Sequence, residues 1–271
     1  MGRGIGSNRF MRFFRVPFLI CLLLVLLPFT AAAQRPSQQA SRPAAAEELF
    51  ALANQSRSQA GAGPMRWDAA LAQAAMHHCE WMVREGQLSH RYGGEPDLTQ
   101  RASAAGAHFS LIEENIAVGS YAAQIHDGWM HSPGHRTNLL NPQVDRVGIA
   151  VIEAHGGMYA VADYSRGVSV LSAEQVESRV GELLRMSGIT MRRDDHDARL
   201  ACRVDHGFPA DMTDGQAKFV MRWQGADLDH LPQDLVDRLG SGRYRSAEVG
   251  ACQPRNAQEG FTVYRLAVLL Y

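Results

Sequence analysis

The 271-residue sequence has no excess of charge of either sign, because 27 Lys and Arg residues stand against 28 Asp and Glu residues. A net charge of -1 supplies no basic field for a phosphate backbone, so no nucleic acid is expected as a partner. The sequence also lacks a long hydrophobic run, since the apolar stretch from Val16 to Phe29 is short for a membrane span of about 20 residues. The mature chain is therefore not expected to be an integral membrane protein.

The short apolar run at the N-terminus has the composition of a secretory signal peptide. Arginines precede it and the small residues TAAAQ follow it. We expect residues 1–33 to be this signal, with cleavage near Ala33, and the protein to be secreted or periplasmic. Residues 34–46, QRPSQQASRPAAA, are polar and aperiodic, and they are expected to form a flexible leader.

Cysteine is scarce, which limits the disulfides that the chain can form. After removal of the signal, only Cys79, Cys202 and Cys252 remain. In an oxidising compartment an even subset of these can pair, and we expect the pair to be Cys202 and Cys252. Cys79 falls inside a helical pattern and nothing in the sequence supplies it with a base, so it is interpreted as a packing residue rather than a nucleophile.

Hydrophobic periodicity predicts an α+β fold in two parts. In the first part, helices are expected within 47–61, 67–87 and 120–130, the last with Ser120 as its N-cap, and two strands within 145–165 form a hairpin. A composition shift at SRGVSVLSAEQ marks a boundary. In the second part, a small α+β domain over residues 171–271, a capping box at Ser172 and Gln175 opens a helix, strands are expected at 198–207 and 218–225, a short helix at 231–240 and a closing strand at 261–271.

The segment WMHSPGHRTNLLNP, residues 129–142, places two histidines four positions apart, as in helical zinc proteases. That pattern needs a glutamate after His131, and the residue there is Ser132. Pro133 also disfavours helical geometry at Ser132, and Gly134 loosens the chain further. The helical zinc pair is rejected, and only His135 remains a candidate. Ser132 with His135 as its base is a further alternative, but no orienting acid can be identified for it.

Two other polar residues could share a site with His135. His90 follows the end of a predicted helix beside two glycines, and Glu114 stands at the entry to an apolar strand-like segment. Two histidines and a glutamate with an open coordination position form the donor set of a catalytic or exchangeable zinc. Each of the three is otherwise read as an ordinary exposed or hydrogen-bonded polar residue.

Four segments, LSHR, EENIAVG, WMHSPGHRTNLLNP and VGIAVIEAHGGMYAVADYS, resemble the CAP superfamily, the cysteine-rich secretory, antigen 5 and pathogenesis-related-1 proteins, in its bacterial form. The resemblance covers about residues 47–165 and implies a CAP-type α-β-α sandwich with a mostly antiparallel sheet over residues 47–166. It also implies a central cleft that often holds a divalent metal. By motif position, the metal ligands would be His90 and His135, and the cleft would be lined by Glu114, Asn115, Ser132 and Arg136. Ser132 stands where eukaryotic members carry a second glutamate.

Two functions fit such a cleft. The first is a secreted, monomeric binding module that holds Zn²⁺ or another divalent cation, uses no organic cofactor, and binds a lipid, a sterol, or a cell-wall glycan or peptide. The second is a metal-dependent, peptidase-like hydrolase in which Glu114 is the general base toward a zinc-bound water. Binding is favoured because the second acid is absent. Residues 171–271 resemble no family, and they are expected either to bind a peptide or glycan or to cover part of the first domain.

Overall fold

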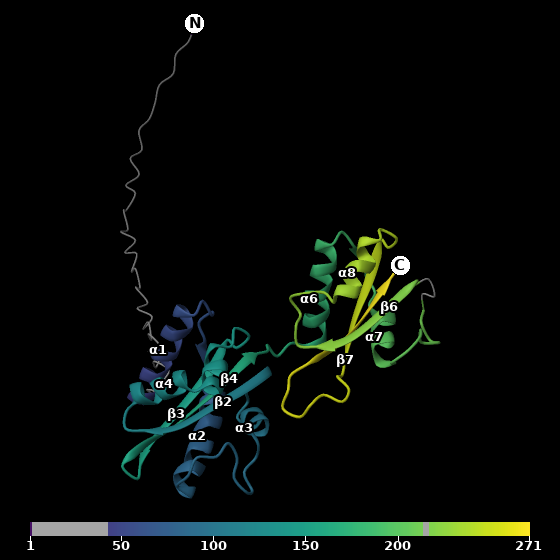
Figure 1. Cartoon of the computed structure of the whole chain (residues 1–271). Helices are drawn as coiled ribbons and strands as arrows, with labels where there is room; N and C mark the ends of the chain where they lie inside the picture. The colour runs from purple at the N-terminus through teal and green to yellow at the C-terminus, as the bar shows by residue number, and fades with distance from the viewer. Residues whose placement is uncertain (2–42, 214–216) are drawn as a thin grey trace. The chain divides into compact units, whose positions relative to one another are not determined.

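The computed structural model describes Met1 and residues 43–213 and 217–271 (Figure 1). The predicted signal peptide and residues 34–42 of the predicted leader lie outside the described residues. Residues 44–46 were also assigned to the flexible leader, which is wrong, because the first helix already begins at Ala44. None of the described helices is long and apolar enough to cross a membrane.

The first part of the chain forms one four-stranded sheet between two layers of helices. Its elements are α1 (Ala44–Gln59), β1 (Arg66–Trp67), α2 (Ala69–Glu85), α3 (Leu98–Ala104), β2 (Phe109–Gly119), α4 (Ala122–His131), α5 (Pro133–Leu140), β3 (Arg146–Ala154) and β4 (Gly157–Gly167). The strand order is β1-β3-β4-β2, with β1 parallel to β3 and the other pairs antiparallel. The predicted α+β fold with a mostly antiparallel sheet is confirmed.

Each face of this sheet is buried against its own set of helices. Apolar residues of α1 and α4 share one core cluster with Val147, Ile149 and Ala162. Residues of α2 share another with Ala150 and Val161, which alternate with the first set along the same strands. This alternation is the period of two that a strand imposes on its side chains. The helices therefore cover both faces, as Figure 1 shows for α1 and α4 against α2 and α3.

The break between α4 and α5 lies at Ser132, as the sequence predicts. Ser132 has extended backbone angles, ends α4 and precedes α5, whose first residue is Pro133. Proline is favoured at that first position, because its missing N–H would have no helical partner there. His131 and His135 consequently belong to different helices. The predicted N-cap at Ser120 is wrong, since α4 begins after Tyr121.

The second part of the chain forms another four-stranded sheet with the order β5-β7-β8-β6. Its elements are α6 (Ala173–Met186), β5 (Thr190–Met191), α7 (His196–Arg203), β6 (Phe219–Gly225), α8 (Gln233–Gly240), β7 (Ser246–Cys252) and β8 (Tyr264–Leu270). The capping box of Ser172 and Gln175 is present at the start of α6. A disulfide joins Cys202 at the end of α7 to Cys252 at the end of β7, which confirms the predicted pair.

The strand predicted at residues 198–207 is wrong, because residues 196–203 form helix α7. Its buried residues are Asp197, Ala198, Ala201 and Cys202, which repeat every three to four positions. In ARLACR the apolar residues Ala198, Leu200 and Cys202 are two positions apart, which fits the period of a strand. The helical period becomes visible only when the face that contacts the sheet is known.

Candidate functional site

The candidate site is built on β2, the edge strand of the first sheet. The side chains of Glu114 and Asn115 point to opposite faces of the sheet, since they are consecutive in a strand. Two side chains from the α4–α5 layer also bind the free edge: Asn138 Nδ2 donates to the carbonyl of Glu114 and Trp129 Nε1 donates to the carbonyl of Ile116, both at 3.1 Å. These bonds satisfy exposed carbonyls of the edge and fix both helices beside it.

His90 reaches Glu114 from the loop that follows α2. Gly86 ends α2 in a left-handed conformation, with φ of 68°. His90 Nδ1 lies 2.7 Å from Glu114 Oε1, and the His90 side chain is 60% exposed whereas that of Glu114 is 3% exposed. The hydrogen bond to Glu114 raises the pKa of His90, and partial burial opposes that shift. A buried carboxylate that holds one ring nitrogen of a histidine leaves the other nitrogen directed toward a ligand.

His135 approaches the same edge from the other helical layer. It lies in the first turn of α5, and Asn115 Nδ2 donates to its backbone carbonyl at 2.9 Å. Neither ring nitrogen of His135 bonds to any residue in the described part of the chain. Burial lowers the pKa of His135, and the charge of the nearby His90 lowers it further. His135 therefore stays neutral at pH 7, which is the form that binds a metal or accepts a hydrogen bond.

A buried cluster of charged side chains from α2, α3 and the loop between them contacts Glu114. Arg101 of α3 donates to Glu114 Oε2 at 2.5 Å and lies 3.4 Å from Glu95 Oε1. His78 of α2 bonds to Glu95 at 2.7 Å through Nδ1. The side chains of His78, Glu95, Arg101 and Glu114 are each 3% exposed or less. Both carboxylate oxygens of Glu114 are thus engaged, one by His90 and one by Arg101.

Asp163 completes this cluster from the neighbouring strand. It stands opposite Glu114 in the register of β2 and β4, and it is 0% exposed. When ionised, Asp163 finds no hydrogen-bond donor among the described residues, whereas its neutral carboxyl can share its proton with Glu114. Burial raises the pKa of Asp163 well above its usual range, and the charge of Glu114 raises it further. A carboxyl group in such surroundings is held in its neutral form.

We expect Asp163→Asn to stabilise the protein at neutral pH. The folded pKa of Asp163 lies above its unfolded value of about 3.9, so the wild type loses stability as pH rises above about 4. The amide does not titrate, and the variant should be more stable at pH 7 by about 1 kcal/mol or more. The gain should vanish below about pH 4, where the carboxyl is protonated in both states. Urea unfolding at pH 3.5 and 7 measures both, and a variant less stable at pH 7 would contradict a neutral Asp163.

The predicted site residues have different positions in the structure. His90 and Glu114 are in direct contact, and His135 lies near them on the opposite layer. Asn115 is fully buried and holds the backbone of His135 rather than lining a surface. Ser132 is half-buried at the helix junction. Arg136 is exposed, and it makes no ion pair within residues 43–213 and 217–271.

The sequence prediction missed the cluster beneath Glu114. His78 was interpreted as a surface or packing group, which is incomplete, because it is buried against Glu95. Glu95, Arg101 and Asp163 were not considered at all. Asp163 offered one signal, since a carboxyl group inside the apolar strand YAVADYS needs a buried partner. Nothing in the sequence connects Arg101 with that strand.

Comparison with known proteins identifies the fold that carries these residues. Residues 50–164 match the family model described as CAP, cysteine-rich secretory protein family. This segment is a CAP domain. The match includes His90, Glu114 and His135, and it does not extend to the second sheet.

Two relatives that match the CAP domain are both named as uncharacterized proteins. The chain is 26% identical over 132 residues to the uncharacterized protein YkwD of Bacillus subtilis (strain 168), a match that covers 46% of this chain and 50% of YkwD. It is 32% identical over 111 residues to the uncharacterized membrane protein YlbC of the same organism, which covers 39% of this chain and 31% of YlbC. The chain therefore spans half or less of the length of these relatives.

Solved structures with similarity to the CAP domain come from several organisms. One is an extracellular protein containing an SCP domain from Bacillus anthracis str. Ames, with 29% identity, a TM-score of 0.43, and coverage of 45% of this chain and 40% of that chain. Another is an outer surface protein from Borrelia burgdorferi, with 18% identity, a TM-score of 0.43, and coverage of 45% of this chain and 92% of that chain.

The CAP domain has no complete protein donor set for a metal among its described residues. No group of three or more His, Cys, Asp or Glu side chains is arranged to hold a metal ion in the described parts of the chain. The expected donor set of His90, Glu114 and His135 is therefore wrong for the described residues, because the oxygens of Glu114 are occupied by His90 and Arg101. A metal at this edge would be held by His90 and His135, with water or a bound ligand as the remaining donors.

Proposed function

We propose that the CAP domain is a secreted binding module whose His90–His135 pair, at the edge of β2, recognises a ligand with the help of a divalent cation. The observation that carries the proposal is the support of His90: a buried carboxylate holds Nδ1, and the exposed ring offers Nε2. A ligand histidine is commonly oriented by a carboxylate in this way. The ligand classes proposed are a lipid, a sterol, or a cell-wall glycan or peptide.

The alternative of a metal-dependent hydrolase is supported less well. A general base must reach the water that attacks the substrate. The side chain of Glu114 is only 3% exposed, and both of its oxygens already accept bonds from His90 and Arg101. Those contacts favour an orienting role for Glu114 over proton abstraction. The geometry therefore supports binding rather than hydrolysis.

Zinc titration of the purified mature protein tests the binding proposal. His90→Ala and His135→Ala should each weaken zinc binding by more than about tenfold, and Glu114→Gln should weaken it by about 10- to 100-fold through its effect on His90. His131→Ala is the matched control, because that histidine is exposed on α4 and bonds to Asp127 within the same helix. Equal zinc affinity in the wild type, His90→Ala and His135→Ala would overturn the metal site.

The choice between binding and hydrolysis needs a second measurement on the same variants. Wild type, His90→Ala, His135→Ala and Glu114→Gln are each tested for hydrolysis of peptide and ester libraries. The same four proteins are tested for cosedimentation with lipid vesicles and with peptidoglycan. Binding that depends on His90 and His135, without turnover that depends on Glu114, supports the module. Turnover that is lost in Glu114→Gln would favour the hydrolase.

A further inference from the structure

The second sheet has the same construction as the sheet of the CAP domain. The strand orders are β1-β3-β4-β2 and β5-β7-β8-β6. In each sheet, a two-residue strand lies parallel to its neighbour, and the other pairs are antiparallel. Along the chain, the strands of both sheets follow the same order: the short strand, the edge strand, and then the two central strands. The two sheets therefore share strand order, strand direction and order along the chain.

The helices of the two parts correspond as well. α2 lies between the short strand and the edge strand of the first sheet, and α7 does so in the second. Each packs on a glycine of the central strand. A Cβ on Gly148 would lie 2.0 Å from the backbone nitrogen of Ala72, the fourth residue of α2. A Cβ on Gly250 would lie 2.2 Å from the nitrogen of Arg199, the fourth residue of α7.

We infer that residues 171–271 are a second, diverged copy of the CAP fold, and that a cluster of arginines in it binds an organic anion carrying a phosphate or carboxylate group. The copy is reduced, because α7 has 8 residues where α2 has 17. The family model does not extend to it. The inference does not depend on the function proposed for the first copy.

The strand register shows that a positive side chain in the second copy takes the position of a negative side chain in the first. In the first copy, Asp163 stands between Gly148 and Glu114. In the second, Ala267 stands between Gly250 and Arg222. Arg222 thus occupies the position of Glu114, and an apolar residue replaces Asp163. Arg222 donates to the carbonyls of Ala201 and Gly207, so it holds the loop after α7 as Glu114 holds the loop after α2.

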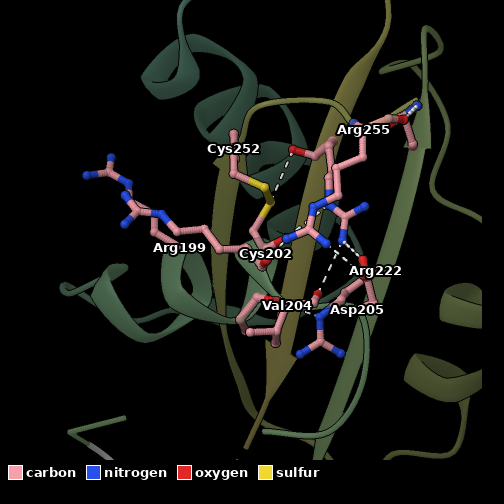
Figure 2. The surroundings of a disulfide bond; sticks show 12 residues. Arg199, Cys202, Val204, Asp205, Arg222, Cys252 and Arg255 are labelled. Carbon is pink, nitrogen blue, oxygen red and sulfur yellow. Dashed lines mark hydrogen bonds and ion pairs between the residues drawn. A yellow bond between two sulfur atoms is a disulfide. The ribbon is translucent and has the colours of Figure 1, made fainter. Parts of the chain in front are cut away.

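Arg265 lies near Arg222, and three arginines, Arg203, Arg255 and Arg265, line a common cavity. Asp205 pairs with Arg255 at 2.6 Å and with Arg265 at 2.7 Å. The guanidinium of Arg203 has no bond to any residue of the described ranges. Figure 2 shows Arg222, Arg255 and Asp205 on one side of the disulfide, with Arg199 extending away on the other. The four arginines, Arg203, Arg222, Arg255 and Arg265, therefore exceed their carboxylate by three charges.

A cavity of about 690 Å³ adjoins this cluster. Arg203, Arg255 and Arg265 line one part of it, beside Cys252 of the disulfide. Apolar side chains line much of the rest, including Leu171, Val176 and Val263, with Gln253 and Tyr264 as polar members. This volume is within the range of small-molecule sites, which is about 300–1,000 Å³. Guanidinium groups recognise phosphate and carboxylate by paired hydrogen bonds, and the apolar wall suits a hydrocarbon body next to that head group.

The disulfide gives the cluster its shape. Cys202 precedes Arg203, and Cys252 lies three residues before Arg255, so the bond ties the two segments that carry these arginines. Arg265 donates to the carbonyls of Cys202 and Val204, which fixes the segment after α7 against β8. Arg255 and Arg265, held by these contacts and by Asp205, can bind an anion with little further loss of conformational freedom.

Calorimetric titration of the mature full-length protein with four probes tests the site. The probes are octyl phosphate, octanoate, inorganic phosphate and the neutral octyl glucoside. Octyl phosphate or octanoate should bind at least tenfold more tightly than either inorganic phosphate or octyl glucoside, since only they offer both the charge and the chain. The preference between the first two identifies the head group.

Substitutions of single arginines test whether the anion binds at this cluster. Arg203→Gln should weaken binding at least tenfold, and Arg203→Glu should abolish it, with unchanged circular dichroism. Arg185→Gln is the matched control, because that arginine is exposed on α6 and pairs with Glu182 of the same helix. His90→Ala and His135→Ala should leave anion binding unchanged, which separates this site from the first. Failure of both amphiphilic anions to bind, or equal binding by wild type and Arg203→Glu, would overturn the anion site.

Discussion

Replacement of Arg101 by Gln is expected to destabilise the CAP domain by about 3–5 kcal/mol at pH 7. Arg101 is the buried cation between Glu95 and Glu114, and its side chain is 2% exposed. Without it, two buried carboxylates face each other with no positive partner from α3. Breaking a buried pair by removing one member leaves an uncompensated charge, which water cannot reach to solvate.

The loss in Arg101→Gln should depend on pH. Lowering the pH protonates carboxyl groups that the missing guanidinium no longer neutralises, so the difference from wild type should shrink as pH falls from 7 to 4. Urea unfolding followed by circular dichroism measures the free energy of unfolding at each pH. Arg66→Gln is the control, since its pair with Asp145 is exposed and should contribute less than about 1 kcal/mol. Equal losses in the two variants would contradict the role given to Arg101.

A double variant separates the buried charge from simple loss of packing. Glu114→Gln removes one of the carboxylates that Arg101 neutralises. If the charge is the main cause, the loss in Arg101→Gln combined with Glu114→Gln should be smaller than the sum of the single losses, by about 1–3 kcal/mol. Strict additivity would instead assign the effect of Arg101 to its packing.

Replacement of Arg57 by Met is expected to have the second large effect, a loss of more than about 3 kcal/mol. Arg57 lies in α1 and is 0% exposed, and it pairs with no carboxylate among the described residues. Its guanidinium instead donates to the backbone carbonyls of Gly63, Leu139, Asn141 and Val144, at 2.7–2.9 Å. Methionine would fill much of the space but would leave these carbonyls without donors.

The effect of Arg57→Met should reach the candidate site. Leu139 lies near the end of α5, the helix that carries His135, so Arg57 anchors that helix to α1. Backbone amides of residues 135–144 should exchange with deuterium faster in the variant. Arg57→Lys should not restore stability, because a single ammonium group has three donors and cannot span four carbonyls. Arg243→Met, at an exposed residue of the second part, is the control, and equal stability of the two Met variants would contradict the anchor.

Local sequence patterns were sufficient to predict the features that depend on a few adjacent residues. Pro133 determines the break that separates His131 from His135, and Ser172 with Gln175 determines the start of α6. The Cys202–Cys252 pair followed from the small number of cysteines. The motifs around His90, Glu114 and His135 were sufficient to identify the CAP domain. Each of these depends on short-range sterics or on a short sequence motif.

Other features emerged only from the packing of distant segments. Helix α7 was mistaken for a strand, because its helical period becomes clear only against the sheet that it covers. Asp163 and Arg101 reach Glu114 from β4 and α3, and strand register and helix packing bring them together. The relation of Arg222 to Glu114 is likewise one of register, between segments with little sequence in common. Short motifs were therefore enough to identify the family and its two candidate histidines, His90 and His135. The buried charges beside them depend on contacts between distant segments, which local patterns do not encode.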